Sequence, residues 1–370
     1  MSGNYRMAKL KKQTHKLAEH IRALMLPYHG RVWIALSGGL DSTVLCHAVA
    51  NALPCDRIKA VYINHHLQAD ADNWSAHCAT FCAQLGISFQ SIDLDTKPQK
   101  GESIEAWARQ SRYAVFAELL DTHDVLLTAH HQNDQAETLL LQLMRGAGPK
   151  GLSSMPVSKA FGKGQHLRPL LSVSRDDLEL YAKTHGLPWV NDPSNESVDY
   201  DRNFIRHEIL PALEKRWPQA VRALGQSAER CADQQALIDQ WAQETLPEYT
   251  HEQPHCLNIA KLLRLSFQER AALIRFWCAA LKLRTPGERV LNILERDLML
   301  AREDANPVVA YEGGEFRRYR QGLYWLDKPA GNRKQSLQGK DSKLFKKHCQ
   351  KQGIPPWERD SLISDMRDSS

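Results

Sequence analysis

Several common features are missing from this sequence, and each absence argues against a class of protein. There is no apolar run of about 18 residues, so we predict no membrane-spanning helix. The eight cysteines are scattered without a Cys-x-x-Cys pair, which argues against structural zinc and against a disulfide framework. Polar and basic residues follow Met1, where a secreted protein carries an apolar signal core. We therefore expect a reduced, cytoplasmic protein with no membrane partner.

What is present is an ordinary globular composition with a mild basic excess. The 370 residues are 42% hydrophobic, and at about 150 residues per domain they predict two or three domains. The net charge of +5 permits a nucleic acid as partner but does not require one. The sequence leaves the oligomeric state open, a homodimer included.

A glycine-rich turn is the stretch around which the chain is organised. Residues 32–36 form a short apolar run that predicts a buried strand, and residues 43–50 predict the helix that follows. A strand, a glycine turn and a helix N-terminus make an anion site, because backbone N–H groups and the helix dipole point at the ligand. The turn lacks the Gly-Lys-Ser/Thr ending of a Walker A loop and the GxGxxG dinucleotide pattern. Its residues are Ser37, Gly38, Gly39, Leu40, Asp41 and Ser42.

Asp41 is the residue of this turn that most constrains its chemistry. A carboxylate beside a phosphate cradle would repel phosphate unless a cation lies between them. Mg²⁺ prefers carboxylate and phosphate oxygens together, so we predict that Asp41 is a Mg²⁺ ligand. The alternative is a plain strand-to-helix turn in which Asp41 or Ser42 caps the helix.

The string Ser37-Gly38-Gly39-Leu40-Asp41-Ser42 resembles the SGGxDS loop of the ATP-pyrophosphatase (PP-loop) superfamily. The resemblance implies an α/β fold with an N-terminal parallel-sheet nucleotide-binding domain. It also implies ATP as a substrate, cleaved between the α- and β-phosphates. Such enzymes adenylate a carbonyl-type oxygen and let a nucleophile displace AMP. The loop therefore indicates the chemistry but not the substrate.

Two histidines follow the second predicted strand, at 57–63. Ligands of open α/β sheets sit at the carboxyl ends of strands, which places His65 and His66 near the nucleotide. A solvated strand end is the alternative. Related enzymes carry a His-His-Gly-Leu-like string here, whereas in this chain Leu67 follows His66 directly.

The helix predicted at 102–120 carries a further candidate. Arg109 and Arg112 are predicted on its outward face, where an arginine is either solvated or a substrate contact. A third predicted strand covers 87–92 and a fourth 124–129, with a helix at 71–85 between the second and third.

A second polar constellation begins where the fourth strand ends. Asp134 and Glu137 are three residues apart at a predicted helix start, so both side chains share one helix face. Such a carboxylate pair suits an ammonium group or Mg²⁺. The alternative is a capping box with Asp134 at the N-cap and Glu137 at N3.

This constellation resembles the HxxDQxET segment of the tRNA(Ile)-lysidine synthetase family. Further strings that match this family follow in the same order. Together with the glycine turn, the matching strings span about 170 residues. They are Arg145-Gly146, Leu167-Arg168-Pro169-Leu170-Leu171, Asn191-Asp192-Pro193-Ser194-Asn195 and Tyr200-Asp201-Arg202-Asn203-Phe204-Ile205-Arg206. Asn133 stands where some relatives carry a second Asp.

The resemblance implies a ligase that joins free L-lysine to carbon 2 of the wobble cytidine in the CAU anticodon of tRNA(Ile). ATP adenylates the base and releases pyrophosphate. Lysine then displaces AMP, and Mg²⁺ is the expected cofactor. Asp41, Asp134, Glu137 and Arg202 are then the expected catalytic residues. Further expected substrate contacts are His65, His66, His131, Arg109, Arg145 and Arg206.

We predict three parts in the chain. They are a PP-loop ATP-binding catalytic domain at 1–218, a small helical tRNA-binding or linker domain at 219–305, and a basic α+β tRNA-binding region at 306–370. Residues 149–165 are predicted as a functional loop, 187–190 as an extended or edge segment, and 308–311 and 316–325 as strands. Between Arg317 and Lys351 eleven Lys or Arg residues face two Asp residues, the footprint expected for a phosphate backbone. The C-terminal region looks short for its family, so either it is abbreviated or stretches are missing from this chain.

Two other functions fit parts of the pattern. A PP-loop tRNA thiolase shares the loop but generally needs reactive cysteines, whereas Cys46 lies on an apolar helix face and is interpreted as core. A catalytically silent RNA-binding protein on the same fold is disfavoured by the intact loop and the carboxylate pair.

Overall fold

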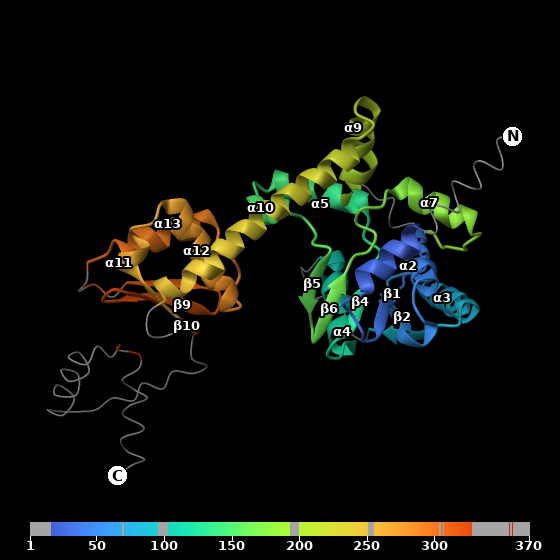
Figure 1. Ribbon diagram of the computed structural model, residues 1–370, viewed down its shortest axis with the longest axis horizontal. Coiled ribbons are helices and arrows are strands. Elements are labelled where there is room, and N and C mark those ends of the chain that lie inside the picture. Colours follow the sequence, from blue (N-terminus) through green and yellow to red (C-terminus); the bar gives the residue numbers. More distant parts are fainter. Residues whose placement is uncertain are drawn as a thin grey trace, which may run out of the picture. The chain divides into compact units, whose positions relative to one another are not determined.

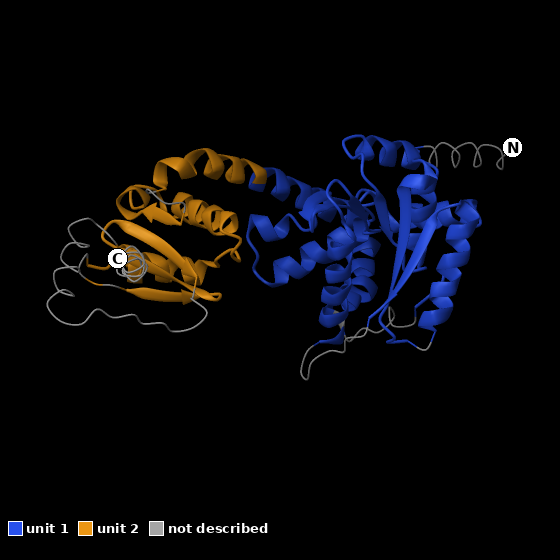
Figure 2. Cartoon of the chain, turned by 90° about the horizontal axis from the view of Figure 1, so that it is seen from below, with its two compact units in different colours: residues 1–235 blue, residues 236–370 orange. Residues whose placement is uncertain are grey.

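The computed structural model describes residues 16–68, 70–94, 103–192, 200–250, 255–302, 305, 307–327, 355 and 357. Two predicted features lie outside these residues: residues 193–195 of the Asn-Asp-Pro-Ser-Asn string, and most of the basic stretch between Arg317 and Lys351. The chain divides into two compact units, residues 1–235 and 236–370 (Figure 2). No helix in the described part is both long enough and apolar enough to cross a membrane.

The first unit contains a six-stranded sheet in the order β3-β2-β1-β4-β6-β5 (Figure 1). Its five parallel strands are β1 (Val32–Ala35), β2 (Ile58–Asn64), β3 (Ser88–Asp93), β4 (Val125–Leu127) and β6 (Gly164–Leu167). β5 (Ser158–Phe161) is antiparallel to β6. The chain runs outward from β1 through β2 to β3 and returns to the other side of β1 for β4. The switch point of the sheet, where ligands of such folds bind, is therefore between β1 and β4.

Helices cover both faces of this sheet because its central strands are apolar on both sides. In β1, Val32 and Ile34 belong to one core and Trp33 to another. The first core includes the helical segment 16–25 together with α2 (Leu40–Ala50), α3 (Ala71–Leu85) and α7 (Arg175–Thr184). The second core includes α4 (Ile104–Leu119). The predicted parallel-sheet α/β architecture is confirmed.

The prediction of a loop at 149–165 is wrong. This stretch contains the short helix α6 (Pro149–Leu152) and the hairpin of β5 and β6. Three of the four β5 residues are exposed, so the strand has no apolar alternation that reveals it in the sequence. The hairpin turns at Gly162, whose φ of 55° favours glycine. The extended segment 187–190 is not a strand, although the Val190 N–H donates to the Gly38 carbonyl at 2.9 Å.

Helices also carry the chain from the first unit into the second. They are α5 (Gln132–Met144), α8 (Asp201–Phe204), the π-helical turn η3 (Ile205–Ile209), α9 (Leu210–Arg216) and α10 (Ala220–Tyr249). α10 continues past Pro247, and it contains the boundary between the units.

The second unit pairs its helices with a small antiparallel sheet. Its elements are β7 (Cys256–Asn258), α11 (Ile259–Leu262), α12 (Phe267–Ala280), α13 (Glu288–Ile293), η4 (Leu294–Met299), β8 (Val308–Tyr311), β9 (Gly314–Tyr319) and β10 (Gly322–Asp327). The sheet order is β7-β10-β9-β8. The predicted strand at 316–325 is two strands, with a turn where Arg320 has a φ of 52°. The predicted domain boundary between residues 305 and 306 would separate β7 from β10. These two strands pair in one sheet and contribute to one core.

A buried carboxylate holds the start of β1 in place. Asp124 is 5% exposed and accepts hydrogen bonds from the Arg31 N–H at 2.9 Å, the Trp33 indole N–H at 3.3 Å and the Asp121 N–H at 3.2 Å. We expect Asp124→Ala to lower the free energy of unfolding by about 2–4 kcal/mol, because it leaves buried donors without an acceptor. Chemical denaturation of the full chain measures this loss. Asp121→Ala, which removes an exposed carboxylate from the same turn, is the control, and an equal loss there would contradict the prediction.

Candidate active site

The glycine turn lies between β1 and α2 and is held by its own hydroxyl groups. Ser42 Oγ accepts the Ser37 N–H at 3.2 Å and donates to the Gly39 carbonyl at 3.0 Å. Thr43 Oγ1 donates to the Gly38 carbonyl at 3.3 Å. Gly39, not Asp41 or Ser42, is the N-cap of α2, so the alternative in which either side chain caps the helix is wrong. The first N–H groups of α2 have no intrahelical partner, as an anion cradle requires.

The Asp41 carboxylate pairs with an arginine from α7. Arg175 Nη1 lies 2.6 Å from both Asp41 oxygens, and His131 Nε2 lies 3.7 Å from Asp41 Oδ2. Burial raises the pKa of Asp41, while His131 and Arg175 act to lower it. Asp41 therefore lies against one arginine and one histidine.

Asp134 and Glu137 project from the first turns of α5, directly after β4. Arg202 and Arg206 approach from α8 and η3 and bridge the two carboxylates. Arg202 donates to Asp134 at 2.8 Å and to Glu137 at 2.7 Å. Arg206 donates to Asp134 at 3.1 Å and to Glu137 at 2.6 and 2.9 Å. The predicted shared face of Asp134 and Glu137 is confirmed, because both carboxylates contact the same two arginines.

His131 links this cluster to the glycine turn. It is the N-cap of α5, and its Nδ1 accepts the Asn133 N–H at 3.2 Å. Its Nε2 lies 3.5 Å from Asp134 Oδ2 and 3.7 Å from Asp41 Oδ2. The capping box of α5 consists of His131 and Asp134, so the predicted version with Asp134 at the N-cap is wrong.

The pKa values of this cluster reflect its pairing. Burial by itself would raise the pKa of Asp134, but His131, Arg202 and His130 outweigh it and lower the pKa to about 2. The pKa values of Arg202 and Arg206 are raised: burial opposes the shift, and the two carboxylates overcome it. Asp134 is therefore a fixed negative charge and a weak proton acceptor at neutral pH.

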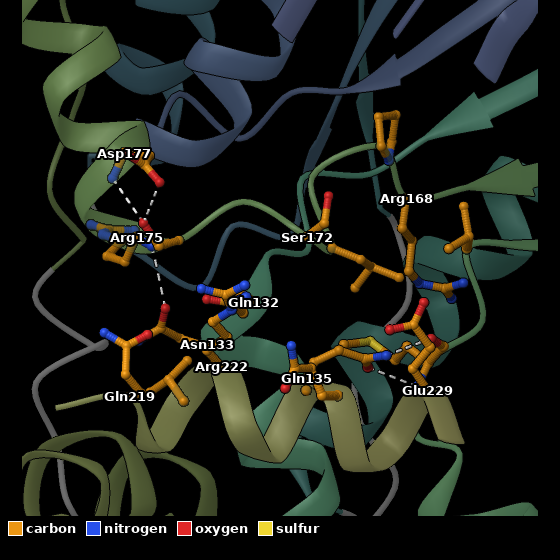
Figure 3. Close-up of a pocket in the computed structure, with 18 of the residues that line it drawn as sticks. Gln132, Asn133, Gln135, Arg168, Ser172, Arg175, Asp177, Gln219, Arg222 and Glu229 are labelled. Atoms are coloured by element: carbon orange, nitrogen blue, oxygen red, sulfur yellow. Dashed lines mark hydrogen bonds between the residues drawn. The ribbon is translucent and has the colours of Figure 1, made fainter. Parts of the chain in front are cut away.

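A cavity of about 830 Å³ lies beside this cluster (Figure 3). It is lined by the start of α5, the segment 168–177 and the start of α10. Figure 3 shows Arg175 at one end of it, where its backbone N–H donates to Asn133 Oδ1 at 3.3 Å. Asp41, Asp134 and Glu137 are not among its lining residues, so the cavity adjoins the charged cluster through Arg175 and Asn133.

The structure does not bring all predicted residues together. Arg145 is the C-cap of α5, exposed and about 16 Å along the helix from Asp134. His66 is exposed, and its Nε2 lies 3.1 Å from Asp93 Oδ1. His65 packs against Trp107 at 5.9 Å between ring centroids, and both of its ring nitrogens are buried without a hydrogen-bond partner among the described residues.

The two arginines of α4 differ in their exposure to solvent. Arg109 is exposed as predicted, but Arg112 is half-buried, and burial lowers its pKa. The outward face predicted for Arg112 is therefore wrong, because α4 packs its Arg112 side towards the sheet.

Arg175 is a residue of this candidate site that was not predicted from the sequence. It occupies the first position of α7, directly after the N-cap Ser174. One feature of the sequence could have indicated Arg175. It lies four residues after the Leu167–Leu171 string, at the start of a helix that follows a parallel strand. Its pairing with Asp41, 134 residues away, is visible only in three dimensions.

No group of three or more His, Cys, Asp or Glu side chains able to hold a metal ion occurs among the described residues. Asp41 is thus a single protein carboxylate at the anion cradle. This donor set fits Mg²⁺, which commonly takes one or two carboxylates and completes its shell with phosphate oxygens and water.

A mostly parallel sheet with a Ser-Gly-Gly-Leu-Asp-Ser turn at its switch point defines a PP-loop nucleotide-binding protein, and the PP-loop domain family matches residues 8–213. A second match, to the TilS substrate binding domain, covers residues 257–324. The chain is 43% identical over 295 residues to the tRNA(Ile)-lysidine synthase of Coxiella burnetii, covering 79% of this chain and 65% of that protein. It is also 43% identical over 318 residues to the tRNA(Ile)-lysidine synthase of Alkalilimnicola ehrlichii, covering 85% of this chain and 70% of that protein.

The chain belongs to the tRNA(Ile)-lysidine synthase family, a family of ligases. The predicted family is therefore confirmed. Among solved structures, the U34-tRNA thiolase NcsA from Methanococcus maripaludis is similar, with a TM-score of 0.50 and 19% identity over 60% of this chain and 77% of that one. This similarity concerns the fold alone.

The glycine turn provides a stability test with a matched control. Gly38 has a φ of 80°, and a Cβ there would lie 3.1 Å from both Cys78 Sγ and Val190 Cγ2. We expect Gly38→Ala to lower the free energy of unfolding by roughly 1–2 kcal/mol through backbone strain alone. Gly39→Ala is the control, because Gly39 has an extended backbone and the nearest atom to its Cβ is Ser37 Oγ at 3.6 Å. Equal melting temperatures of the two variants would contradict the assignment.

The low pKa of Asp134 predicts a pH dependence of stability. Because its folded-state pKa of about 2 lies below the unfolded value, ionised Asp134 stabilises the fold fully above about pH 4. This contribution is lost as the pH falls towards 2. We expect Asp134→Asn to cost about 2 kcal/mol at pH 7 and much less near pH 2.5. Urea denaturation at both pH values measures it, with the exposed Asp233→Asn as control; a cost independent of pH would refute the ionic role.

Proposed function

We propose that this chain ligates free L-lysine to carbon 2 of the wobble cytidine of tRNA(Ile) with a CAU anticodon, using ATP and releasing pyrophosphate and AMP. One observation carries the proposal. The carboxylate of the PP-loop, Asp41, and the carboxylate pair of α5 meet at one histidine, with His131 Nε2 3.7 Å from Asp41 and 3.5 Å from Asp134. This proximity supports ATP activation and amine binding within one site at the switch point of the sheet.

The turn Ser37–Ser42 is proposed to hold the phosphates of ATP. The N–H groups at the start of α2 face the phosphates and stabilise the charge that develops on the leaving pyrophosphate. Asp41 would hold Mg²⁺, which supplies charge neutralisation to this step when bound. Arg175 contacts both Asp41 oxygens, so metal binding by Asp41 requires that Arg175 release at least one of them.

Asp134 and Glu137 are proposed to hold the ammonium group of lysine. Each carboxylate offers about four acceptor positions, and three hydrogen bonds to each leave about one position apiece. Two remaining acceptors on neighbouring residues fit one ammonium group. With a pKa of about 2, Asp134 is suited to binding and orienting the amine rather than to removing its proton.

Affinity for tRNA is proposed to come from several parts of the chain. The match to the TilS substrate binding domain falls in the second unit, over β7 to β10. Trp357 packs there, with its ring 5.2 Å from that of Tyr324 and the Arg317 guanidinium 5.6 Å from its centre. Most of the basic stretch predicted to contact phosphates, from residue 328 on, lies outside the described residues.

The thiolase alternative needs an accessible thiol, whereas the described thiols near the turn are buried. Cys46, Cys78 and Cys82 are at most 1% exposed and belong to the core of the first unit. Burial raises the pKa of Cys78 to about 12, which keeps it protonated at neutral pH. The residues nearest the PP-loop therefore favour amine ligation over sulfur transfer.

Incorporation of radiolabelled lysine into unmodified tRNA(Ile) with a CAU anticodon tests the proposal. We expect labelling that requires ATP and Mg²⁺, and a loss of about 100-fold or more in Asp41→Asn, the scale of removing one group that stabilises transition-state charge. Asp56→Asn, an exposed carboxylate near β2, is the control and should label like the unmodified chain.

Two other outcomes would overturn the proposal. AMP release that depends on tRNA, without lysine labelling, would leave PP-loop chemistry in place and direct attention to sulfur transfer. Neither AMP release nor labelling, with tRNA still bound, would indicate a catalytically silent RNA-binding protein.

A further inference from the structure

Four cationic side chains gather beside α4, outside the carboxylate site. They form the α4 cation cluster: Arg109, Arg112, Lys159 and Arg168. Arg109 and Arg112 come from α4, Lys159 from β5, and Arg168 directly follows β6. The four side chains differ in exposure. Arg109 and Lys159 are exposed and form the rim of the cluster, Arg112 is half-buried, and Arg168, which is 4% exposed, forms its floor.

The floor of the cluster is a chain of buried polar groups. Arg168 Nη2 lies 3.2 Å from His166 Nδ1, and His166 Nε2 lies 2.8 Å from Thr128 Oγ1. Thr128 Oγ1 also lies 2.8 Å from His130 Nδ1, one residue before the His131 of the carboxylate site. Arg168 Nη1 donates to the Pro156 carbonyl at 2.8 Å, but Arg168 Nε is buried and has no partner among the described residues. An unpaired donor of this kind points to a missing acceptor.

Aromatic rings line the same place. The Arg109 guanidinium lies 5.0 Å from the Tyr113 ring centre, and the Tyr113 ring lies 5.7 Å from those of His166 and Phe161. Cations interleaved with aromatic rings are typical of surfaces that track a single-stranded nucleic acid.

No carboxylate balances this charge within the described residues, where no ion pair joins the cluster to an acidic side chain. Burial is the main cause of the lowered pKa values of Arg168, Arg112 and Lys159. Tyr113 opposes this shift at the two arginines, and neighbouring cations add to it at all three residues. His130 and His166, with pKa values of about 3 and 2, are neutral at pH 7 and supply no charge themselves. The cluster is therefore a preformed place for an anion.

We propose that the α4 cation cluster binds a backbone phosphate of the RNA substrate beside the nucleotide that enters the carboxylate site. This inference rests on the proposed function. The phosphates of ATP already have the N–H cradle of α2, whereas the RNA needs its own anchor near His131. A graded row of cations, from an exposed rim to a buried floor, suits a chain of successive phosphates.

The hairpin of β5 and β6 offers a matched pair of variants for the test. Lys159 belongs to the cluster, and Lys163 lies in the exposed turn of the same hairpin. The probe is a synthetic anticodon stem–loop RNA with a CAU loop, and binding is measured by fluorescence anisotropy over a series of salt concentrations. We expect Lys159→Gln to weaken binding roughly tenfold, the scale of one charge-assisted hydrogen bond. We also expect its salt dependence to become shallower by about one unit of slope, with the same loss for a stem–loop of another loop sequence. Lys163→Gln should bind like the unmodified chain.

Arg109→Gln on α4 provides a second, exposed variant and should behave like Lys159→Gln. Equal RNA affinities of Lys159→Gln, Arg109→Gln and Lys163→Gln would overturn the proposal. So would weaker ATP binding in the absence of RNA, or a raised KM for lysine with RNA binding intact, because the anion would then be a nucleotide phosphate or the lysine carboxylate. Lysine labelling by the unmodified chain is measured alongside, so a failure of this inference is distinguishable from a failure of the proposed function.

Discussion

The buried ion-pair network of Asp134, Glu137, Arg202 and Arg206 is the constraint on which the site depends. Glu137 has no exposed surface, and a buried carboxylate is strongly unfavourable unless cations and hydrogen bonds compensate it. The two arginines provide that compensation, and in doing so they tie α8 and η3 to the start of α5. Since α5 begins where β4 ends, the network also fixes the position of His131 beside the PP-loop carboxylate.

The charged side chains of the first unit discussed above fall into three sets. Asp41 is balanced by Arg175, the α5 carboxylates are balanced by Arg202 and Arg206, and the α4 cation cluster has no acidic partner in the described residues. A reaction that joins an anionic nucleotide, an ammonium group and an RNA needs positively and negatively charged side chains close together. The electrostatics of the site thus follow the three ligands of the proposed reaction more closely than they follow the needs of stability.

Much of the fold was predictable because its signals are local. The apolar runs of β1, β2 and β4 and the periodicity of α3 and α4 specify buried elements, and their order specifies a parallel sheet. The hairpin of β5 and β6 escaped prediction because its exposed strand has no apolar alternation. β7 escaped because three residues form too short a pattern, and their strand character comes from pairing with β10 more than 60 residues later.

The sequence by itself determined the chemistry of the loop, the family and the two carboxylates of α5, because each depends on residue types at short, fixed spacings. Tertiary structure alone decided which charges meet. Arg175 reaches Asp41 across 134 residues, Arg206 reaches Glu137 across 69, and Arg145 stays at the far end of its helix. The physical reason is that an ion pair forms where burial removes water and the backbone brings two side chains within hydrogen-bond distance. Both conditions are set by how the elements pack and not by the spacing of residues along the chain.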